Sequence, residues 1–173
     1  FDFEDRQLYD EHIKFLKREL RNEKISVPQD LIPMDWDRQF EDGLAKKGIL
    51  YFQDFFTKRN LYILLLLHHK IQSFESELTN AQYELLRMVF SNVIKDTNIM
   101  SFTNDGWQSG KPTTWSKHAY WVPNQYCEVS IAPYFDKSLE RVESAINYNS
   151  AQGYAPLFAS NFEDIRAGKA NIF

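Results

Sequence analysis

The hydrophobic positions of the chain follow the 3.6-residue period of an α-helix along four stretches. The strongest begins after Thr57, where apolar residues cover most of the circumference: Leu61, Ile63, Leu64, Leu65, Leu66, Leu67, Ile71 and Phe74. Such a helix has to be covered on several sides. Thr57 suits its N-cap, because a hydroxyl oxygen there can accept a free backbone N–H. The stretch is too short for a membrane span, and Lys and His flank it closely.

Two amphipathic helices are expected on either side of this one. Residues 4–24 carry an apolar face, which we expect to consist of Leu8, His12, Phe15, Leu16 and Leu20. A second helix is expected to start at Thr79, because the sequence TNAQ has the form of a capping box. Its core face is expected to hold Leu85, Leu86, Val89, Phe90, Val93 and Ile94. Only a short link separates this helix from the one after Thr57, so the two are predicted to pack antiparallel.

A last long helix is predicted over residues 134–148. Its shared face is expected to hold Phe135, Leu139, Val142 and Ile146, with Pro133 near the first turn. Between the helices, Pro28 and Pro33 break residues 25–47 into a connecting arm, which Trp36 and Phe40 are expected to pin to the body.

Residues 97–114 have the composition of a long polar loop. The aromatic stretch 113–131 and the end at 170–173 are expected to form short strands. Together these elements predict a mainly α fold, α+β at most: a helical domain with a small strand element.

We expect a single domain over residues 1–173, since the length and the 43% hydrophobic content suffice for one core. Within it, residues 1–47 would form the N-terminal helix and connecting arm. Residues 48–173 would form the helical core with the aromatic loop or strand segment. Because the sequence starts at Phe1 and not at Met, we expect it to be a piece of a larger protein.

The charge balance restricts the function classes. A net charge of −4 argues against a surface that is basic overall, so any nucleic-acid contact must come from a local patch. In the first helix, Glu11, Glu19 and Glu23 interleave with a row of basic residues as expected ion-pair partners, which favours an ordinary solvated face. That row consists of Lys14, Lys17, Arg18 and Arg21. A single cysteine excludes an intrachain disulfide and fits the reducing cytoplasm, where we expect the protein to reside.

Signatures of catalysis are missing from the sequence. There is no G-x-S-x-G, Walker or H-E-x-x-H motif. His68 and His69 diverge by about 100° on a helix, and no carboxylate–histidine set lies four residues away, so no metal site is expected there. The functional candidates are therefore binding residues.

Two groups of residues are candidates for binding an anionic polymer. Lys58, Arg59 and Asn60 open a helix, where free N–H groups and the helix dipole favour phosphate; the alternative is that they are ordinary solvated residues. The second group interleaves aromatic and basic side chains that can stack on bases and neutralise backbone charge. It consists of Trp107, Lys111, Trp115, Lys117, His118, Tyr120 and Trp121. The alternative is that Trp115, Tyr120 and Trp121 belong to the core.

Three segments resemble parts of a known family. The run GILYFQDFFTKRNL at Gly48–Leu61, the run WSKHAYWVP at 115–123 and the final GKANIF at 168–173 are similar, in this order, to segments of bacterial adenine-specific DNA methylases of the N4/N6 amino-methyltransferase class. In that family the last segment precedes the catalytic Asp/Asn-Pro-Pro-Tyr loop. The resemblance reaches across residues 48–173.

The resemblance implies that the parent protein transfers a methyl group from S-adenosylmethionine to a DNA amino group. The catalytic D/N-P-P-Y/W loop of the family is missing here, because no two of the six prolines are adjacent. The cofactor glycine turn is missing too, since no two glycines form G-x-G. We therefore expect a non-catalytic middle region without a cofactor of its own, with DNA and the remaining domains of the parent as partners. The alternative is a helical protein-interaction module, whose association, unlike DNA binding, would be insensitive to salt.

Overall fold

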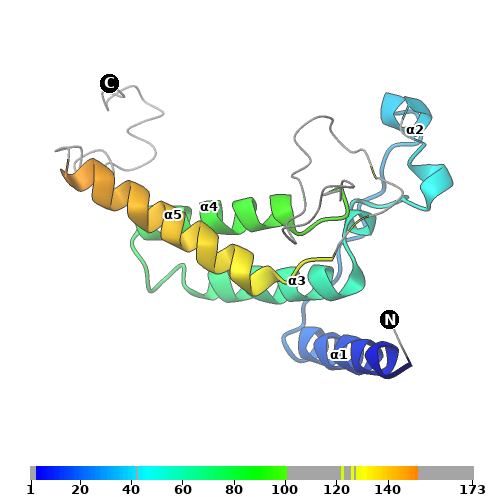
Figure 1. The fold of residues 1–173 in the computed structure, drawn as a ribbon, viewed down its shortest axis with the longest axis horizontal. Coiled ribbons are helices and arrows are strands. Elements are labelled where there is room, and N and C mark those ends of the chain that lie inside the picture. The colour runs from blue at the N-terminus through cyan, green and yellow to red at the C-terminus, as the bar shows by residue number, and fades with distance from the viewer. Residues whose placement is uncertain (1–2, 42, 101–121, 123–125, 127, 152–173) are drawn as a thin grey trace. The chain divides into compact units, whose positions relative to one another are not determined.

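The computed structural model describes residues 3–41, 43–100, 122, 126 and 128–151 (Figure 1). In this part of the chain the predicted mainly α fold is confirmed. The α-helices are α1 (Phe3–Asn22), α2 (Asp37–Glu41), α3 (Lys58–Ser73), α4 (Asn80–Asp96) and α5 (Ile131–Ala151). Two 3-10 turns, η1 (Ala45–Lys47) and η2 (Phe52–Phe55), lie between α2 and α3. The strands expected within 113–131 and at 170–173 fall almost wholly outside the described residues.

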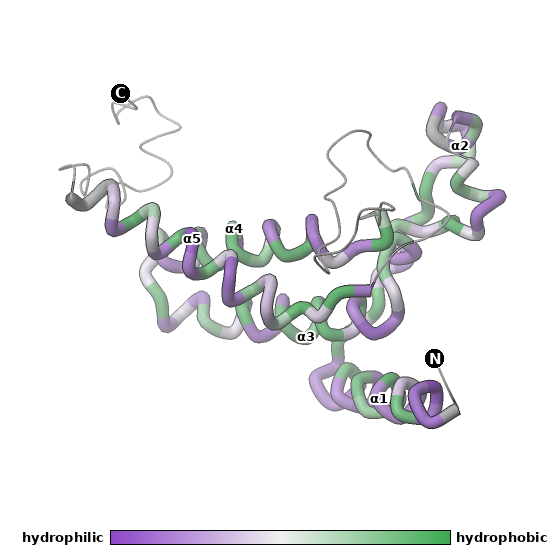
Figure 2. The backbone as a smooth tube through the Cα atoms, in the orientation of Figure 1, coloured by the Kyte–Doolittle hydropathy of each residue, from purple (hydrophilic) through white to green (hydrophobic). Residues whose placement is uncertain are grey.

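The chain divides into two compact units. The first comprises Phe1–Leu67 and Ile94–Ile131, and the second comprises His68–Val93 and Ala132–Phe173. Helix α3 therefore contributes its first ten residues to one unit and its last six to the other. Hydrophobic residues follow one another over residues 61–67 in the middle of this helix, and polar residues occupy its first turn and most of its end (Figure 2).

The core of the first unit gathers around the segment that leads into α3. Its buried side chains are Ile32, Leu44, Ile49, Phe55, Ile99, Met100 and Val122. The connecting arm lies beside this segment, since the N–H of Ile32 donates to the carbonyl of Leu50 over 2.9 Å. Gly48 ends η1 at a φ of 79°, a conformation that glycine adopts without strain. The chain can thus turn back and bring Ile49 into the core.

The arm is held by Trp36 but not by Phe40. Trp36 packs against the core as predicted. The prediction for Phe40 is wrong, because its side chain is 79% exposed. The neighbouring Gln39 is turned inward instead, and its Oε1 accepts the N–H of Ala45 over 3.0 Å. Since successive residues of a helix point about 100° apart, an inward Gln39 places Phe40 in solvent.

Helix α1 exists as predicted, but it is rotated by about one residue from the expected face. Leu16 and Leu20 are buried, and Tyr9 and Ile13 are half-buried. Leu8 and Phe15, both expected in the core, are 66% and 49% exposed. His12 is exposed as well. The buried face of α1 is therefore the one formed by positions 9, 13, 16 and 20. On this face, Tyr9 contacts the first turn of α3.

The start of α3 is fixed by two side chains. Thr57 is the N-cap as predicted, because its Oγ1 accepts the N–H of Asn60 over 3.3 Å. Asn60 is buried, and its Nδ2 donates to the carbonyl oxygens of Thr97 (3.0 Å) and Val129 (3.1 Å). These two bonds join the first turn of α3 to the segment after α4 and the segment before α5. Asn60 is therefore the point at which three parts of the first unit meet.

The second unit consists of the end of α3 with α4 and α5. The capping box at Thr79 is confirmed: the N–H of Thr79 donates to Gln82 Oε1 over 3.0 Å, and the N–H of Gln82 to Thr79 Oγ1 over 3.4 Å. The ring centroids of His68 and Phe90 lie 5.3 Å apart, so the end of α3 runs beside α4 with opposite direction, as predicted (Figure 1).

Helix α5 is confirmed and is longer than expected, but one residue of its predicted face is wrong. Leu139 is 45% exposed, and Ser138 is buried in its place. The hydroxyl of Ser138 lies 3.4 Å from the carbonyl oxygen of Val89 and donates to it. This bond turns Ser138 toward α4 and leaves Leu139 in solvent.

The buried amide of Asn60 predicts that an aspartate variant is less stable than an alanine variant. Asn60→Ala removes both donated hydrogen bonds and should lower the free energy of unfolding by about 2 to 4 kcal/mol. Asn60→Asp keeps the size of the side chain but sets a carboxylate against two carbonyl oxygens, so it should cost more than alanine at neutral pH. Denaturant unfolding measures both values.

Asn92→Ala on the exposed side of α4 is the control, with an expected change within about 0.5 kcal/mol. An aspartate variant as stable as the alanine variant would show that the two donated bonds do not hold this region together.

Candidate functional site

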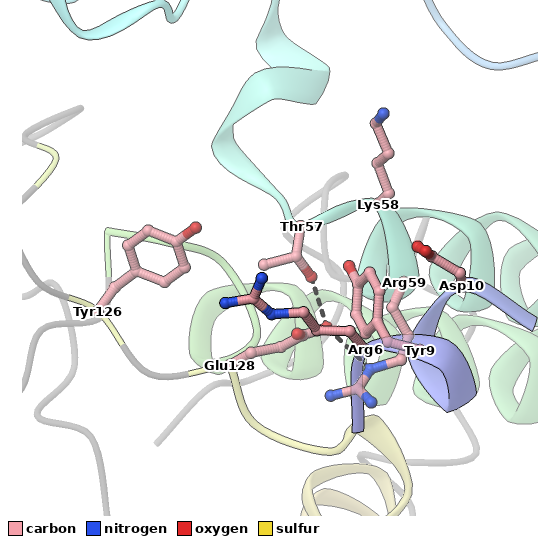
Figure 3. A pocket seen from close by; sticks show the side chains of 8 residues that line it. All are labelled: Arg6, Tyr9, Asp10, Thr57, Lys58, Arg59, Tyr126 and Glu128. Atoms are coloured by element: carbon pink, nitrogen blue, oxygen red, sulfur yellow. Dashed lines mark hydrogen bonds and ion pairs between the residues drawn. The ribbon is translucent and has the colours of Figure 1, made fainter. Parts of the chain in front are cut away.

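A cleft of about 950 Å³ opens in the first unit at the N-terminus of α3. Side chains from three segments line it, as Figure 3 shows. They are Arg6, Tyr9 and Asp10 from α1, Thr57, Lys58 and Arg59 from the start of α3, and Tyr126 and Glu128. The positive end of the helix dipole lies at this point of α3. The N–H of Asn60 is already capped by Thr57 Oγ1, and the N–H of Arg59 faces the Tyr9 hydroxyl.

Glu128 organises the wall of the cleft. Its Oε1 accepts the hydroxyl hydrogen of Thr57 over 2.7 Å and the Nε–H of Arg59 over 3.0 Å. The side chain of Glu128 is largely buried, and a buried carboxylate needs both a cationic partner and hydrogen bonds. The helix start provides both. The contact therefore fixes the position of the Arg59 side chain.

Arg59 also holds α1 to the cleft. Its guanidinium carbon lies 5.3 Å from the centre of the Tyr9 ring, within the range of a cation–π contact. Burial raises the pKa of the Tyr9 phenol, and the negative charge of Glu128 raises it further. The backbone N–H and the positive charge of Arg59 act in the opposite direction. Because the net effect is upward, Tyr9 stays neutral at physiological pH and presents an aromatic face and a hydroxyl.

The cleft carries an excess of positive charge in an acidic chain. Three cations face two carboxylates there, which leaves one net positive charge. Lys58 is exposed, and within the described residues neither a hydrogen bond nor an ion pair engages its ammonium group. Two tyrosine rings lie in the same wall. This combination suits a ligand with both anionic and aromatic groups.

The structure brings two of the predicted site residues into the cleft. Lys58 and Arg59 line it. Asn60 does not, because its side chain is 2% exposed and its amide is used by Thr97 and Val129. In this structure Asn60 positions the cleft and is not available for direct contact with DNA. The remaining candidates lie outside the described residues: Trp107, Lys111, Trp115, Lys117, His118, Tyr120 and Trp121.

Sequence reasoning missed the partners that complete the cleft. Glu128 lies about 70 positions from Arg59, and no local pattern links the two. Tyr9 had a detectable signal, since it belongs to the apolar series that continues at positions 13, 16 and 20. Arg6 and Asp10 enter the cleft because that series faces the body of the unit and carries them to its edge.

The described part of the chain offers neither a cluster of metal ligands nor a membrane-spanning helix. No three His, Cys, Asp or Glu side chains lie there in an arrangement that would hold a metal ion. Likewise, none of the helices described there combines the length and apolar character that crossing a bilayer requires.

The raised pKa of Tyr9 predicts a loss of stability at alkaline pH. Its folded-state pKa exceeds the unfolded value of about 10, so the neutral phenol contributes stability below about pH 10 that disappears as the pH rises through the folded-state pKa. The free energy of unfolding should therefore fall more steeply above about pH 10 in the native sequence than in Tyr9→Phe. Tyr148→Phe, at an exposed position, should retain the native slope. Equal slopes for all three proteins would contradict the burial of Tyr9 against α3.

The chain was compared with models of protein families, with curated proteins and with solved structures, and it matches none of them significantly.

Proposed function

We propose that this chain is a non-catalytic region of a bacterial S-adenosylmethionine-dependent DNA adenine methyltransferase, and that it positions DNA through the cleft at the start of α3. The observation that carries the proposal is the gathering of three cations and two tyrosine rings around a helix N-terminus. Thr57, Lys58 and Arg59 belong to the segment Gly48–Leu61, which resembles these methylases. The resemblance and the charged cleft thus fall on the same residues.

Each group of the cleft has a physical role in this proposal. Lys58 and the positive end of the α3 dipole attract a phosphate. The rings of Tyr9 and Tyr126 offer stacking surfaces for bases, and stacking tolerates any base. Glu128 holds Arg59 in place and offsets part of its charge, which limits the affinity. A region that positions DNA for another domain needs moderate affinity that does not depend on sequence.

Methyl transfer in this proposal belongs to the remaining domains of the parent protein. They would hold S-adenosylmethionine and supply the D/N-P-P-Y/W loop that takes up the flipped base. The present segment contributes no catalytic residue and no cofactor site. The parent protein would act in the cytoplasm, where its DNA substrate is found.

A helical protein-interaction module is the second candidate. The observation in its favour is that Leu8 and Phe15 expose apolar side chains on the outside of α1. Burying such side chains is a usual source of affinity between proteins. This association would change little with salt, whereas DNA binding weakens steeply as salt rises.

The test uses two substitutions with opposite expected effects on binding to short duplex and single-stranded DNA. Lys58→Gln should weaken binding several-fold and reduce the dependence of log K on log salt by about 1. Glu128→Gln removes a negative charge from the cleft and should strengthen binding at low salt. Fluorescence anisotropy at about 50 and 200 mM salt measures both effects.

Lys46→Gln is the matched control, because it removes one exposed positive charge from the same unit but away from the cleft lining. It should bind like the native chain. Unchanged affinity in both cleft variants, or no DNA binding at low salt, would contradict the proposal; salt-insensitive capture of a protein partner would support the interaction module instead.

A further inference from the structure

Basic side chains continue from the cleft along one flank of α1. At about 100° per residue, Arg6, Lys14, Lys17 and Arg21 fall within an arc of about 80°. Asp10 is the one acidic residue of α1 within that arc. Glu4, Asp5 and Glu19 point to the opposite side of the helix, and Glu11 lies between, about 60° from Lys14. The helix therefore separates its charges around its circumference, although its sequence mixes them.

The ion pairs expected for this helix do not engage Lys14, Lys17 or Arg21. Glu19 contacts Arg18 over 3.3 Å and Asn22 over 3.4 Å, and Glu11 accepts a hydrogen bond from Gln7 over 3.3 Å. Of the expected ion pairs along this row, the structure shows the one between Arg18 and Glu19. The side chains of Arg6, Lys14, Lys17 and Arg21 are exposed, and no side-chain hydrogen bond or ion pair joins any of them to another described residue.

The basic flank of α1, from Arg21 to Arg6, is long enough to contact several phosphates and ends at the cleft. Arg6 and Arg21 are separated by 15 residues, or about 22 Å along the helix. One strand of duplex DNA carries about six phosphates over that distance. Arg6 also lines the cleft, so the flank and the cleft share a residue and form one continuous surface.

We propose that the basic flank of α1, made of Arg6, Lys14, Lys17 and Arg21, binds the sugar–phosphate backbone of the DNA that flanks the segment in the cleft. This inference rests on the proposed function and adds a second contact to it. The contact is electrostatic and independent of sequence, as backbone contacts are. The acidic flank repels phosphate on the other side, so DNA can follow α1 along one side only.

An anionic membrane surface is a poorer fit for these residues. A membrane-binding helix sets basic residues on both borders of an exposed apolar face. In α1, Glu4, Glu11 and Glu19 border the exposed Leu8 and Phe15, and Arg18, over the Phe15 ring, is the single basic residue of the helix beside them. The apolar series with Leu16 and Leu20 is already buried in the protein. Charge complementarity therefore favours a polyanion that needs no apolar contact.

The test compares two triple variants that lose the same charge. One is Lys14→Gln/Lys17→Gln/Arg21→Gln, which leaves the cleft intact; glutamine maintains the helix because its helix propensity is close to that of lysine and arginine. The other is Lys46→Gln/Lys70→Gln/Lys137→Gln, at exposed positions that do not belong to α1 or to the cleft lining. Duplex DNA affinity is measured by anisotropy at several salt concentrations, and circular dichroism checks the helix content.

The flank variant should lose at least about tenfold in affinity at low salt, and its slope of log K against log salt should be smaller by about 2.7. The control should keep the native slope. A native slope in the flank variant, with binding still weakened by Lys58→Gln, would overturn the inference and leave the proposed function in place. Absence of DNA binding by the native chain would overturn both.

A further arm uses vesicles of phosphatidylserine and phosphatidylcholine. If the flank variant lost vesicle binding and retained native DNA binding, the flank would be a membrane contact and the inference would be wrong.

Discussion

The buried amide of Asn60 is the interaction on which the first unit depends. Its two donated hydrogen bonds join the first turn of α3 to Thr97, just after α4, and to Val129, just before α5. An amide at this depth is costly unless its donors are satisfied, so the three segments are stable only together. Val129 follows Glu128, and the same bonds thus bring the Glu128 carboxylate to Thr57 and Arg59. The geometry of the cleft is in this sense a consequence of one core hydrogen-bond pair.

Local patterns in the sequence were sufficient to predict most helices and their starts. Apolar periodicity located α1, α3, α4 and α5, and hydroxyl residues at 57 and 79 marked two N-termini, because capping depends on residues within one turn. Which face of a helix is buried was harder to predict. Helix α1 has two apolar series, at positions 8, 12 and 15 and at positions 9, 13, 16 and 20. Only contacts with residues distant in the sequence determine which series is buried. Leu139 was misplaced for the same reason, since the bond from Ser138 to Val89 fixes α5.

The candidate site was predictable only in part. Lys58 and Arg59 follow from the position of a helix start, which is a local property. Glu128 and Tyr9 reach the cleft through contacts across 69 and 50 positions of the chain, and single-sequence periodicity contains no information on such pairs. The acidic net charge of the chain likewise gave no indication of the local basic surface at Lys58 and along α1. Arg59 shares its charge with Glu128, whereas Lys58 and the flank of α1 remain exposed to solvent.

We propose that the start of α3 and the adjoining flank of α1 face DNA. An NMR titration of the chain with a short DNA duplex, following backbone amide shifts at low salt, tests this directly. The largest changes are expected at Thr57, Lys58 and Arg59 and along α1 near Arg6, with reversal on adding salt. Changes confined to α4 and α5, or none at all, would contradict it.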